Sequence, residues 1–295
     1  MQNKPNPGAE ILEGAQKTLL LPLWARAKET LSTHPILTDK RAVEIVEGLH
    51  TCREYQSTFD LMEKNLEPFY RLSQLIRAKC IDDEIKTYLC SHPKATVVNI
   101  GAGLDTTFER VDNGEIKWYD LDLPEVISLR DRFLSESGRR KNIAKSVLDL
   151  SWFDEIGPVQ NGLIFAACGV FFFLEAKQMR RLICELANRF PGSEIVFDTM
   201  SKLFLTISNW TVLGKGGMGS NARLQWSIQS AAEMTKWTNR ISVMDEYPMY
   251  SRVRMDPAWG KAGINRMKVV NRFHGINIFH LSFAPDQGAT AVQSV

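Results

Sequence analysis

The chain has 295 residues, enough for two average domains or one elaborated domain. Hydrophobic residues make up 44% and charged residues 24%, a globular balance that excludes collagen-like, coiled-coil and disordered proteins. With 36 basic and 34 acidic residues, the net charge of +2 is not that of a nucleic-acid-binding surface, so no nucleic acid partner is expected.

Neither a membrane anchor nor a leader is predicted. The longest nearly unbroken apolar run, residues 163–174, is shorter than the roughly 20 residues of a membrane-spanning helix. The first twenty residues lack the basic start and apolar stretch of a signal peptide. We therefore expect no membrane partner and a cytoplasmic location.

The cysteines predict neither a disulfide framework nor a metal site. They are odd in number and contain no C-x-x-C pair, so we expect reduced and mostly buried thiols and no bound metal. The five are Cys52, Cys80, Cys90, Cys168 and Cys184.

Residues 1–92 are predicted to form a helical N-terminal cap. A mobile tail is expected up to about residue 15, followed by apolar residues at helical spacing. One helix is expected to start at Thr38 or Asp39, which can cap it, and to stop at Gly48.

Residues 93–200 alternate short apolar strands with helical segments. Strands are predicted at 96–100, 116–121, 163–167 and 194–197, with a weaker candidate at 142–147. A helix with an apolar stripe ends at Pro191 and Gly192. This alternation predicts an α/β fold with a doubly wound, mostly parallel sheet, which binds ligands beyond the carboxyl ends of its strands.

Residues 201–259 are rich in Trp, Met and Gly, and neither the helical nor the strand periodicity of apolar residues holds throughout. We predict an inserted substrate lid with a helix at about 221–239, and we expect Trp210 and Trp226 to cover the acceptor. Residues 260–295 are expected to supply C-terminal strands that complete the sheet, including one at 276–283.

The first predicted strand runs directly into Gly101 and Gly103, which permit a tight turn and close approach of a ligand to the backbone. Because such turns also use glycine for steric reasons, a purely structural role is equally compatible with the glycines alone. The second strand ends in Asp120 and Asp122, either of which can hydrogen-bond a ribose. We favour Asp122, with Asp120 second, and expect the other to be a surface or cap residue.

A dinucleotide fingerprint requires a third glycine where this chain has Thr106, so NAD is disfavoured as the cofactor.

The runs NIGAGLDTTFERV, YDLDLPEVISLR and SVLDLSWFDEI resemble the leucine carboxyl methyltransferase family, and more closely its bacterial tetracenomycin-type O-methyltransferases. The resemblance covers about residues 18–283. It implies a seven-stranded class I methyltransferase sheet that binds S-adenosyl-L-methionine and releases S-adenosyl-L-homocysteine.

Carried over by position, the resemblance also implies site residues. Arg77 would pair with the carboxylate of the methionine moiety, although an arginine on a helix is otherwise usually solvated. Asp149 and Leu150 would frame the adenine, with an N-cap as the alternative role of Asp149. The remaining implied cofactor contacts are Gly101, Gly103 and Asp122.

The fourth strand departs from the family pattern. Cys168 stands near the expected cofactor site, where many members have glutamate. We favour a small buried apolar role for this thiol over a polar cofactor contact. Phe172, within the run 171–173, is expected either to line the methyl-transfer cavity or to fill core.

No histidine lies in a motif that identifies a general base, so no catalytic residue is assigned. The leading hypothesis is an O-methyltransferase of a small molecule, with a carboxylate or a phenol or hydroxyl as acceptor and secondary metabolism as the suggested setting. The alternatives are a protein C-terminal carboxyl methyltransferase, a non-catalytic cofactor-binding protein and, more weakly, an NAD-dependent oxidoreductase. The oligomeric state is left open.

Overall fold

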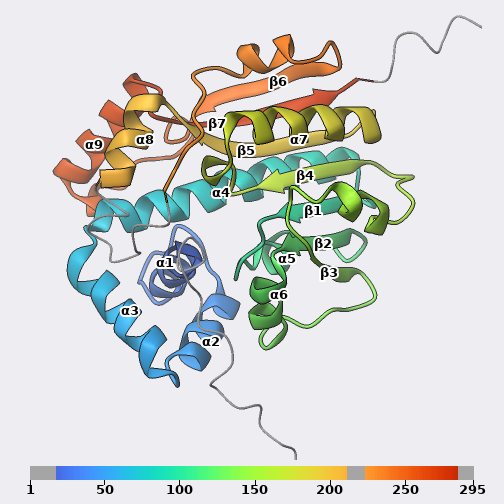
Figure 1. Ribbon diagram of the computed structural model, residues 1–295. Coiled ribbons are helices and arrows are strands. Elements are labelled where there is room, and N and C mark those ends of the chain that lie inside the picture. Colours follow the sequence, from blue (N-terminus) through green and yellow to red (C-terminus); the bar gives the residue numbers. More distant parts are fainter. Residues whose placement is uncertain (1–17, 211–222, 285–295) are drawn as a thin grey trace, which may run out of the picture.

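Helices form the first part of the structure, a computed structural model that describes residues 18–210 and 223–284 (Figure 1). The expected start of the second helix is confirmed, because the Asp39 carboxylate accepts the N–H of Ala42 at 2.9 Å. That helix ends one residue past Gly48, and the expected tail lies outside the described residues. These helices are α1 (Leu20–Thr30), α2 (Lys40–Leu49), α3 (Arg53–Asn65) and α4 (Pro68–Ser91).

A seven-stranded sheet follows, in the order β3-β2-β1-β4-β5-β7-β6. The first five strands are parallel, and β7 runs antiparallel to both β5 and β6. This arrangement confirms the predicted doubly wound, mostly parallel sheet. The strands are β1 (Thr96–Ile100), β2 (Lys117–Asp122), β3 (Arg140–Ala144), β4 (Leu163–Ala167), β5 (Glu194–Met200), β6 (Ile241–Pro248) and β7 (Ile276–Phe283).

Helices cover both faces of the sheet because successive strand residues point to opposite sides. Val97 and Ile164 pack in the cluster that contains α4 and the cap, whereas Val98 and Phe165 pack in the cluster that contains α7. The remaining helical elements are α5 (Thr107–Val111), α6 (Pro124–Asp131), η2 (Leu150–Glu155), η3 (Phe171–Phe173), α7 (Ala176–Arg189), α8 (Lys202–Ser208), η5 (Ala231–Lys236), η6 (Pro257–Trp259) and α9 (Lys261–Arg272).

The region expected to be a lid differs from the prediction. Instead of a helix over 221–239, the described part holds irregular chain and the short η5, which Ser230 and Glu233 close with a capping box. Burial of Trp226 and Met234 in the core fixes this path. Residues 241–248 then form the edge strand β6, so the expected lid contributes to the sheet. The glycine cluster at 213–220 lies outside the described residues.

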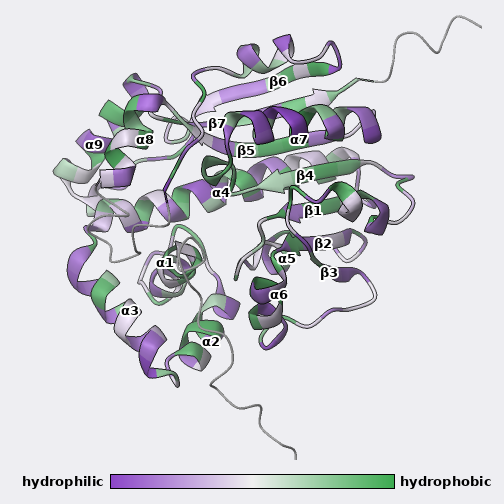
Figure 2. Cartoon of the chain, in the orientation of Figure 1, coloured by the Kyte–Doolittle hydropathy of each residue, from purple (hydrophilic) through white to green (hydrophobic). Residues whose placement is uncertain are grey.

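Burial follows position in the sheet. Figure 2 shows β4 hydrophobic along its length, whereas the edge strand β6 is mostly pale or hydrophilic, as expected for a strand with one open side. In the described residues, no helix has the length and apolar character needed to cross a bilayer.

The thiols are free, as predicted, but they are not mostly buried. Cys80 is buried, Cys90 is exposed and the other three are intermediate. No group of three potential metal ligands occurs within 18–210 and 223–284.

Candidate functional site

A cavity of about 590 Å³ lies beyond the carboxyl ends of the parallel strands, within the range of about 300–1,000 Å³ typical of ligand sites. One end adjoins β1, β2 and β3, and we call it the glycine-turn end. The other adjoins β5, β7, α8 and α9, and we call it the apolar end. The glycine-turn end is lined by Gly101, Gly103, Asp105, Asp122 and Lys145, and the apolar end by Phe172, Phe173, Met200, Phe204, Ile207 and Val269.

The turn after β1 brings bare backbone to the cavity wall. Gly101 and Gly103 have φ values of +66° and +48°, a conformation that favours glycine. A Cβ built on Gly101 would lie 2.3 Å from a Val170 methyl carbon, so a side chain does not fit there. The N–H groups of Gly101 and Ala102 donate to the Leu121 carbonyl at 2.8 and 3.1 Å, which fixes the turn against β2.

Asp122 lines the glycine-turn end, as expected for the favoured ribose contact. Its carboxylate accepts the N–H of Gly103 at 2.7 Å and the N–H of Leu123 at 2.7 Å. Burial raises the pKa of this carboxyl group. The bonds hold the carboxylate at the cavity wall, where it can accept hydrogen bonds from a diol.

Asp120 is not a cavity residue, nor is it the surface or cap residue expected of the second aspartate. It is fully buried and accepts bonds from Arg130 at 2.8 Å, Arg140 at 2.8 Å and the indole N–H of Trp118 at 2.9 Å. Asp120 is buried instead because arginines from two elements, α6 and β3, compensate its charge inside the protein.

Arg77 reaches from α4 to the carboxyl-end side of β4 and β5 and lines the cavity there. Its Nη1 lies 3.3 Å from an oxygen of Asp198, whose other oxygen accepts the N–H of Gly169 at 2.6 Å. A Cβ on Gly169 would come within 2.8 to 2.9 Å of the guanidinium. Burial alone would lower the pKa of Arg77, but the Asp198 carboxylate raises it, so the guanidinium stays charged.

Cys168 also lines the cavity, between Arg77 and the glycine turn. Burial raises the pKa of its thiol to about 12. The thiol is therefore neutral at physiological pH and is neither a nucleophile nor a charged contact.

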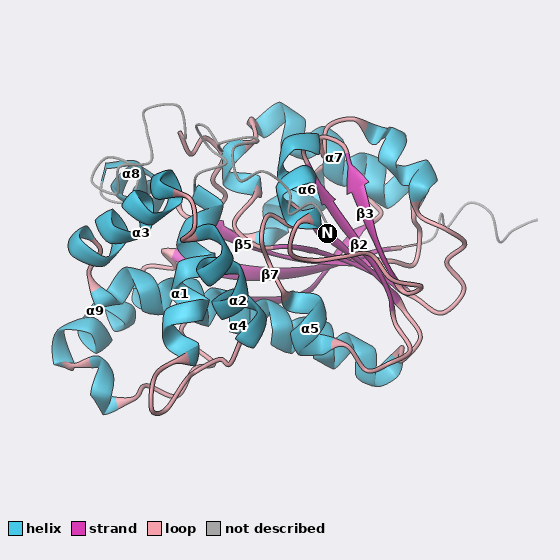
Figure 3. Ribbon diagram, turned by 90° about the horizontal axis from the view of Figure 1, so that it is seen from below, coloured by secondary structure: helices cyan, strands magenta, loops and turns pink. Residues whose placement is uncertain are grey.

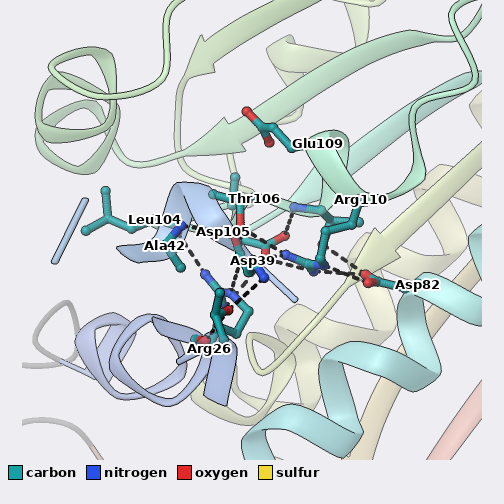
Figure 4. A network of polar contacts seen from close by, with 12 residues as sticks. Arg26, Asp39, Ala42, Asp82, Leu104, Asp105, Thr106, Glu109 and Arg110 are labelled. Atoms are coloured by element: carbon teal, nitrogen blue, oxygen red, sulfur yellow. Dashed lines mark hydrogen bonds and ion pairs between the residues drawn. The ribbon is translucent and has the colours of Figure 1, made fainter. Parts of the chain in front are cut away.

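A buried polar network ties the cap to the loop that follows the glycine turn (Figure 4). Arg26 of α1 donates to Asp39 at 2.8 Å and to the Leu104 carbonyl at 3.0 Å. Arg110 of α5 donates to Asp82 of α4 at 2.7 Å and to Asp39 at 3.1 Å. Three cap helices thus hold the loop in place, so the cap supports the glycine-turn end.

The residues expected to frame the adenine, Asp149 and Leu150, are not among those that line the cavity. Asp149 is exposed and accepts the N–H of Ser151 at 3.1 Å, which is the capping role given as its alternative. Leu150 packs against the core on the α7 face. Residues 145–147 line the cavity at this point instead.

The aromatic residues divide between core and cavity. Phe171 is core, whereas Phe172 lines the apolar end. Trp226, expected over the acceptor, is instead buried against Phe197 on the α7 face, where the irregular chain needs a large apolar group to fill the core. Trp210 is exposed just beyond α8 and is not among the described lining residues.

Comparison with known proteins assigns the chain to a family. Residues 20–187, more than half of the chain, match leucine carboxyl methyltransferase. The chain belongs to this family. The resemblance of the glycine-turn and aspartate motifs is thereby confirmed, and the protein is an S-adenosyl-L-methionine-dependent methyltransferase.

Individual relatives of this methyltransferase agree. It is 24% identical over 270 residues to the tetracenomycin polyketide synthesis O-methyltransferase TcmP of Streptomyces glaucescens, covering 89% of this chain and 95% of that protein. It is 24% identical to the S-adenosyl-L-methionine-dependent methyltransferase dpfgK of Gibberella zeae, covering 81% and 86%. A putative methyltransferase from Thermobifida fusca YX shares its fold, with a TM-score of 0.57, 13% identity and coverage of 88% and 94%.

The residues present fit the family's cofactor. The glycine turn leaves room where a Cβ would clash, and Asp122 offers a carboxylate suited to a ribose. Arg77 offers a charged fork whose buried Nε has no hydrogen-bond partner among the described groups.

Among the residues that sequence reasoning missed is Asp198, which holds both Arg77 and the Gly169 turn. An acidic residue near the end of the predicted strand at 194–197 was the available signal, the same signal that identified Asp122 after the second strand.

Proposed function

We propose that this methyltransferase transfers a methyl group to an oxygen of a small apolar molecule. The observation that carries the proposal is the apolar end of the cavity, which is continuous with the glycine-turn end. S-adenosyl-L-methionine, when bound, supplies a methyl group on a positively charged sulfur. The name of the Streptomyces glaucescens relative supports a polyketide-like acceptor.

The protein's own part is positioning. Arg77, Asp122 and the backbone of the glycine turn would hold the cofactor at one end. Phe172, Phe173 and their apolar neighbours would orient the acceptor and exclude water at the other. Holding two reactants in a fixed geometry away from water accelerates a displacement without any covalent intermediate on the protein.

A carboxylate acceptor fits the cavity better than a phenol. Among the described lining residues, the carboxylates Asp105 and Asp122 lie at the glycine-turn end, and neither histidine nor glutamate lines the cavity. A carboxylate needs no base because it is already ionised at neutral pH, whereas a phenol has a pKa near 10.

A methyl-transfer screen tests the proposal, with aromatic acids, phenols and a peptide ending in leucine as acceptors and mass spectrometry as readout. We expect methyl esters of aromatic acids. Methylation of the phenols alone would contradict the carboxylate assignment. Methylation of the peptide alone would favour the protein carboxyl alternative and overturn the small-molecule proposal.

A further inference from the structure

An apolar face is exposed where α8 and α9 meet solvent. Leu203, Ile207 and Trp210 follow one another at i, i+4 and i+7 on and just beyond α8, and Val269 and Phe273 are four residues apart on and just beyond α9. All five are between 41% and 68% exposed. A helix of a globular protein normally turns such a stripe toward the core. We call these five residues the α8–α9 face.

The α8–α9 face adjoins the mouth of the cavity. Ile207 and Val269 belong to the face and also line the apolar end. Gly275, just after α9, lies against the Phe204 ring of α8, because a Cβ built on it would be 2.6 Å from that ring. Figures 1 and 3 place both helices at the same end of the molecule.

Basic residues are concentrated in the segment that contains α9, although the whole chain is nearly neutral. Residues 252–274 contain six lysines and arginines and one aspartate, against a net charge of +2 for the chain. Three of the exposed residues that directly precede a member of the face in sequence are basic: Lys202, Lys268 and Arg272. Arg266, which lines the cavity, is paired with Glu67.

We propose that the α8–α9 face docks the protein on an anionic lipid surface. Large apolar residues among lysines and arginines are the composition of helices that lie in a membrane interface, and tryptophan is enriched there. The sequence predicted no membrane partner because no segment can span a bilayer, but docking on the surface requires no such segment.

Other occupants fit the face less well. In a dimer with two-fold symmetry, the α8–α9 face would contact the same face of the second copy. Lys268 and Arg272 of the two copies would then be brought together, and their like charges would repel. An acidic protein would match the charge but would leave unexplained why the mouth of an apolar cavity opens in the same face. A bilayer explains both, because it would supply an apolar acceptor directly to the cavity. Only the supply of an acceptor by the bilayer rests on the proposed function; the docking itself does not.

Sedimentation with vesicles tests the docking on the full chain. We expect the protein to sediment with vesicles containing phosphatidylglycerol and much less with phosphatidylcholine alone. The double variant Lys268→Glu/Arg272→Glu should weaken partitioning at least tenfold, because each basic residue near an anionic surface contributes roughly fivefold. The matched control, Lys177→Glu/Arg181→Glu on exposed positions of α7, should sediment like wild type.

Fluorescence locates the contact. Brominated lipids should quench the tryptophan emission of wild type, and Trp210→Phe should remove that quenching while sedimentation is kept. Leu203→Ser should weaken sedimentation, whereas Leu31→Ser, at an apolar position 73% exposed after α1, should not. The proposal is overturned by absence of sedimentation at low salt or by equal losses in the control variants. It is also overturned by binding to polyglutamate without binding to vesicles, which would indicate an acidic protein partner.

Discussion

The two ends of the cavity are built in different ways. At the glycine-turn end, the wall includes backbone and charged side chains from the ends of β1 and β2 and from the loop after β1. At the apolar end, it is side chains from segments far apart in sequence, including Phe172, Ile207 and Val269. The glycine-turn end is therefore built around a local sequence motif that its supporting contacts hold in place. The apolar end depends instead on how helices distant in sequence pack together.

The supporting contacts differ in the same way. Behind the glycine-turn end lie buried charges such as Arg26 and Asp39, and removing one partner of a buried pair typically costs about 3–5 kcal/mol. The apolar end rests on side-chain packing, where swaps that conserve volume usually cost less than about 1.5 kcal/mol. We therefore expect substitutions at the first end to act on cofactor binding and those at the second on the acceptor.

The largest effect is expected for Gly101→Val. The new Cβ would lie 2.3 Å from Val170 at a φ of +66°, so the turn must move and the thermal stabilisation by S-adenosylhomocysteine should disappear. Gly192→Val is the matched control, because its φ is +84° but an added Cβ meets nothing within 4 Å. A wild-type thermal shift in the Gly101 variant would place the cofactor elsewhere.

Asp198→Asn should weaken binding of S-adenosylhomocysteine by on the order of tenfold to a hundredfold, the loss expected for a charge-assisted contact. The amide still accepts a bond from Gly169 but no longer compensates the charge of Arg77. Calorimetric titration measures the dissociation constant, with the exposed Asp154→Asn as control. If stability falls while affinity stays at the wild-type value, Asp198 only supports the fold.

Phe173→Ala tests the apolar end. Phe173 is half-buried at the cavity wall, and loss of the contact of its ring with an apolar acceptor should raise the KM for that acceptor about tenfold. The dissociation constant of S-adenosylhomocysteine should not change. Equal losses for acceptor and cofactor would show that the two ends are not separable.

A pH-dependent effect on stability, with none on either ligand, is expected from a region that serves neither end. Burial alone would lower the pKa of His280, but the carboxylates of Glu194 and Glu84, at 2.7 and 3.0 Å, raise it to about 9. Because the folded pKa exceeds the unfolded value of 6.5, this stabilisation is complete below about pH 6.5 and is lost as the pH rises through about 9.

In denaturant unfolding, the free energy of unfolding of wild type should fall by on the order of 3 kcal/mol as the pH rises through this range. That of His280→Gln should change little. Cofactor affinity should be unchanged in the variant, since His280 is not among the residues that line the cavity. An altered affinity would link this region to the site.

The sequence predicted much of the sheet and of the glycine-turn end because both depend on local patterns. The bounds of β1 and β4 follow from short apolar runs, and Asp122 from its spacing to Gly103. The edge strand β6 was missed because its exposed side carries polar residues that break the apolar pattern.

The residue roles that the sequence did not predict depend on tertiary contacts. Whether Trp226 covers an acceptor or fills the core depends on the strand beneath it, which no local pattern encodes. Asp120 and Asp122 are equivalent by spacing, and only the arginines packed against Asp120 separate their roles. The apolar end was unpredictable because its residues come together only in the folded chain.

The assignment of the cofactor to the glycine-turn end is tested most directly by one calorimetric titration of S-adenosylhomocysteine into three proteins. Wild type should bind, and Asp122→Asn should bind at least tenfold more weakly, since a charged acceptor contributes about 1.5–3 kcal/mol. Asp120→Asn should lose stability but keep the wild-type dissociation constant. Absence of binding to wild type at millimolar ligand, or loss of affinity in Asp120→Asn but not in Asp122→Asn, would contradict the assignment.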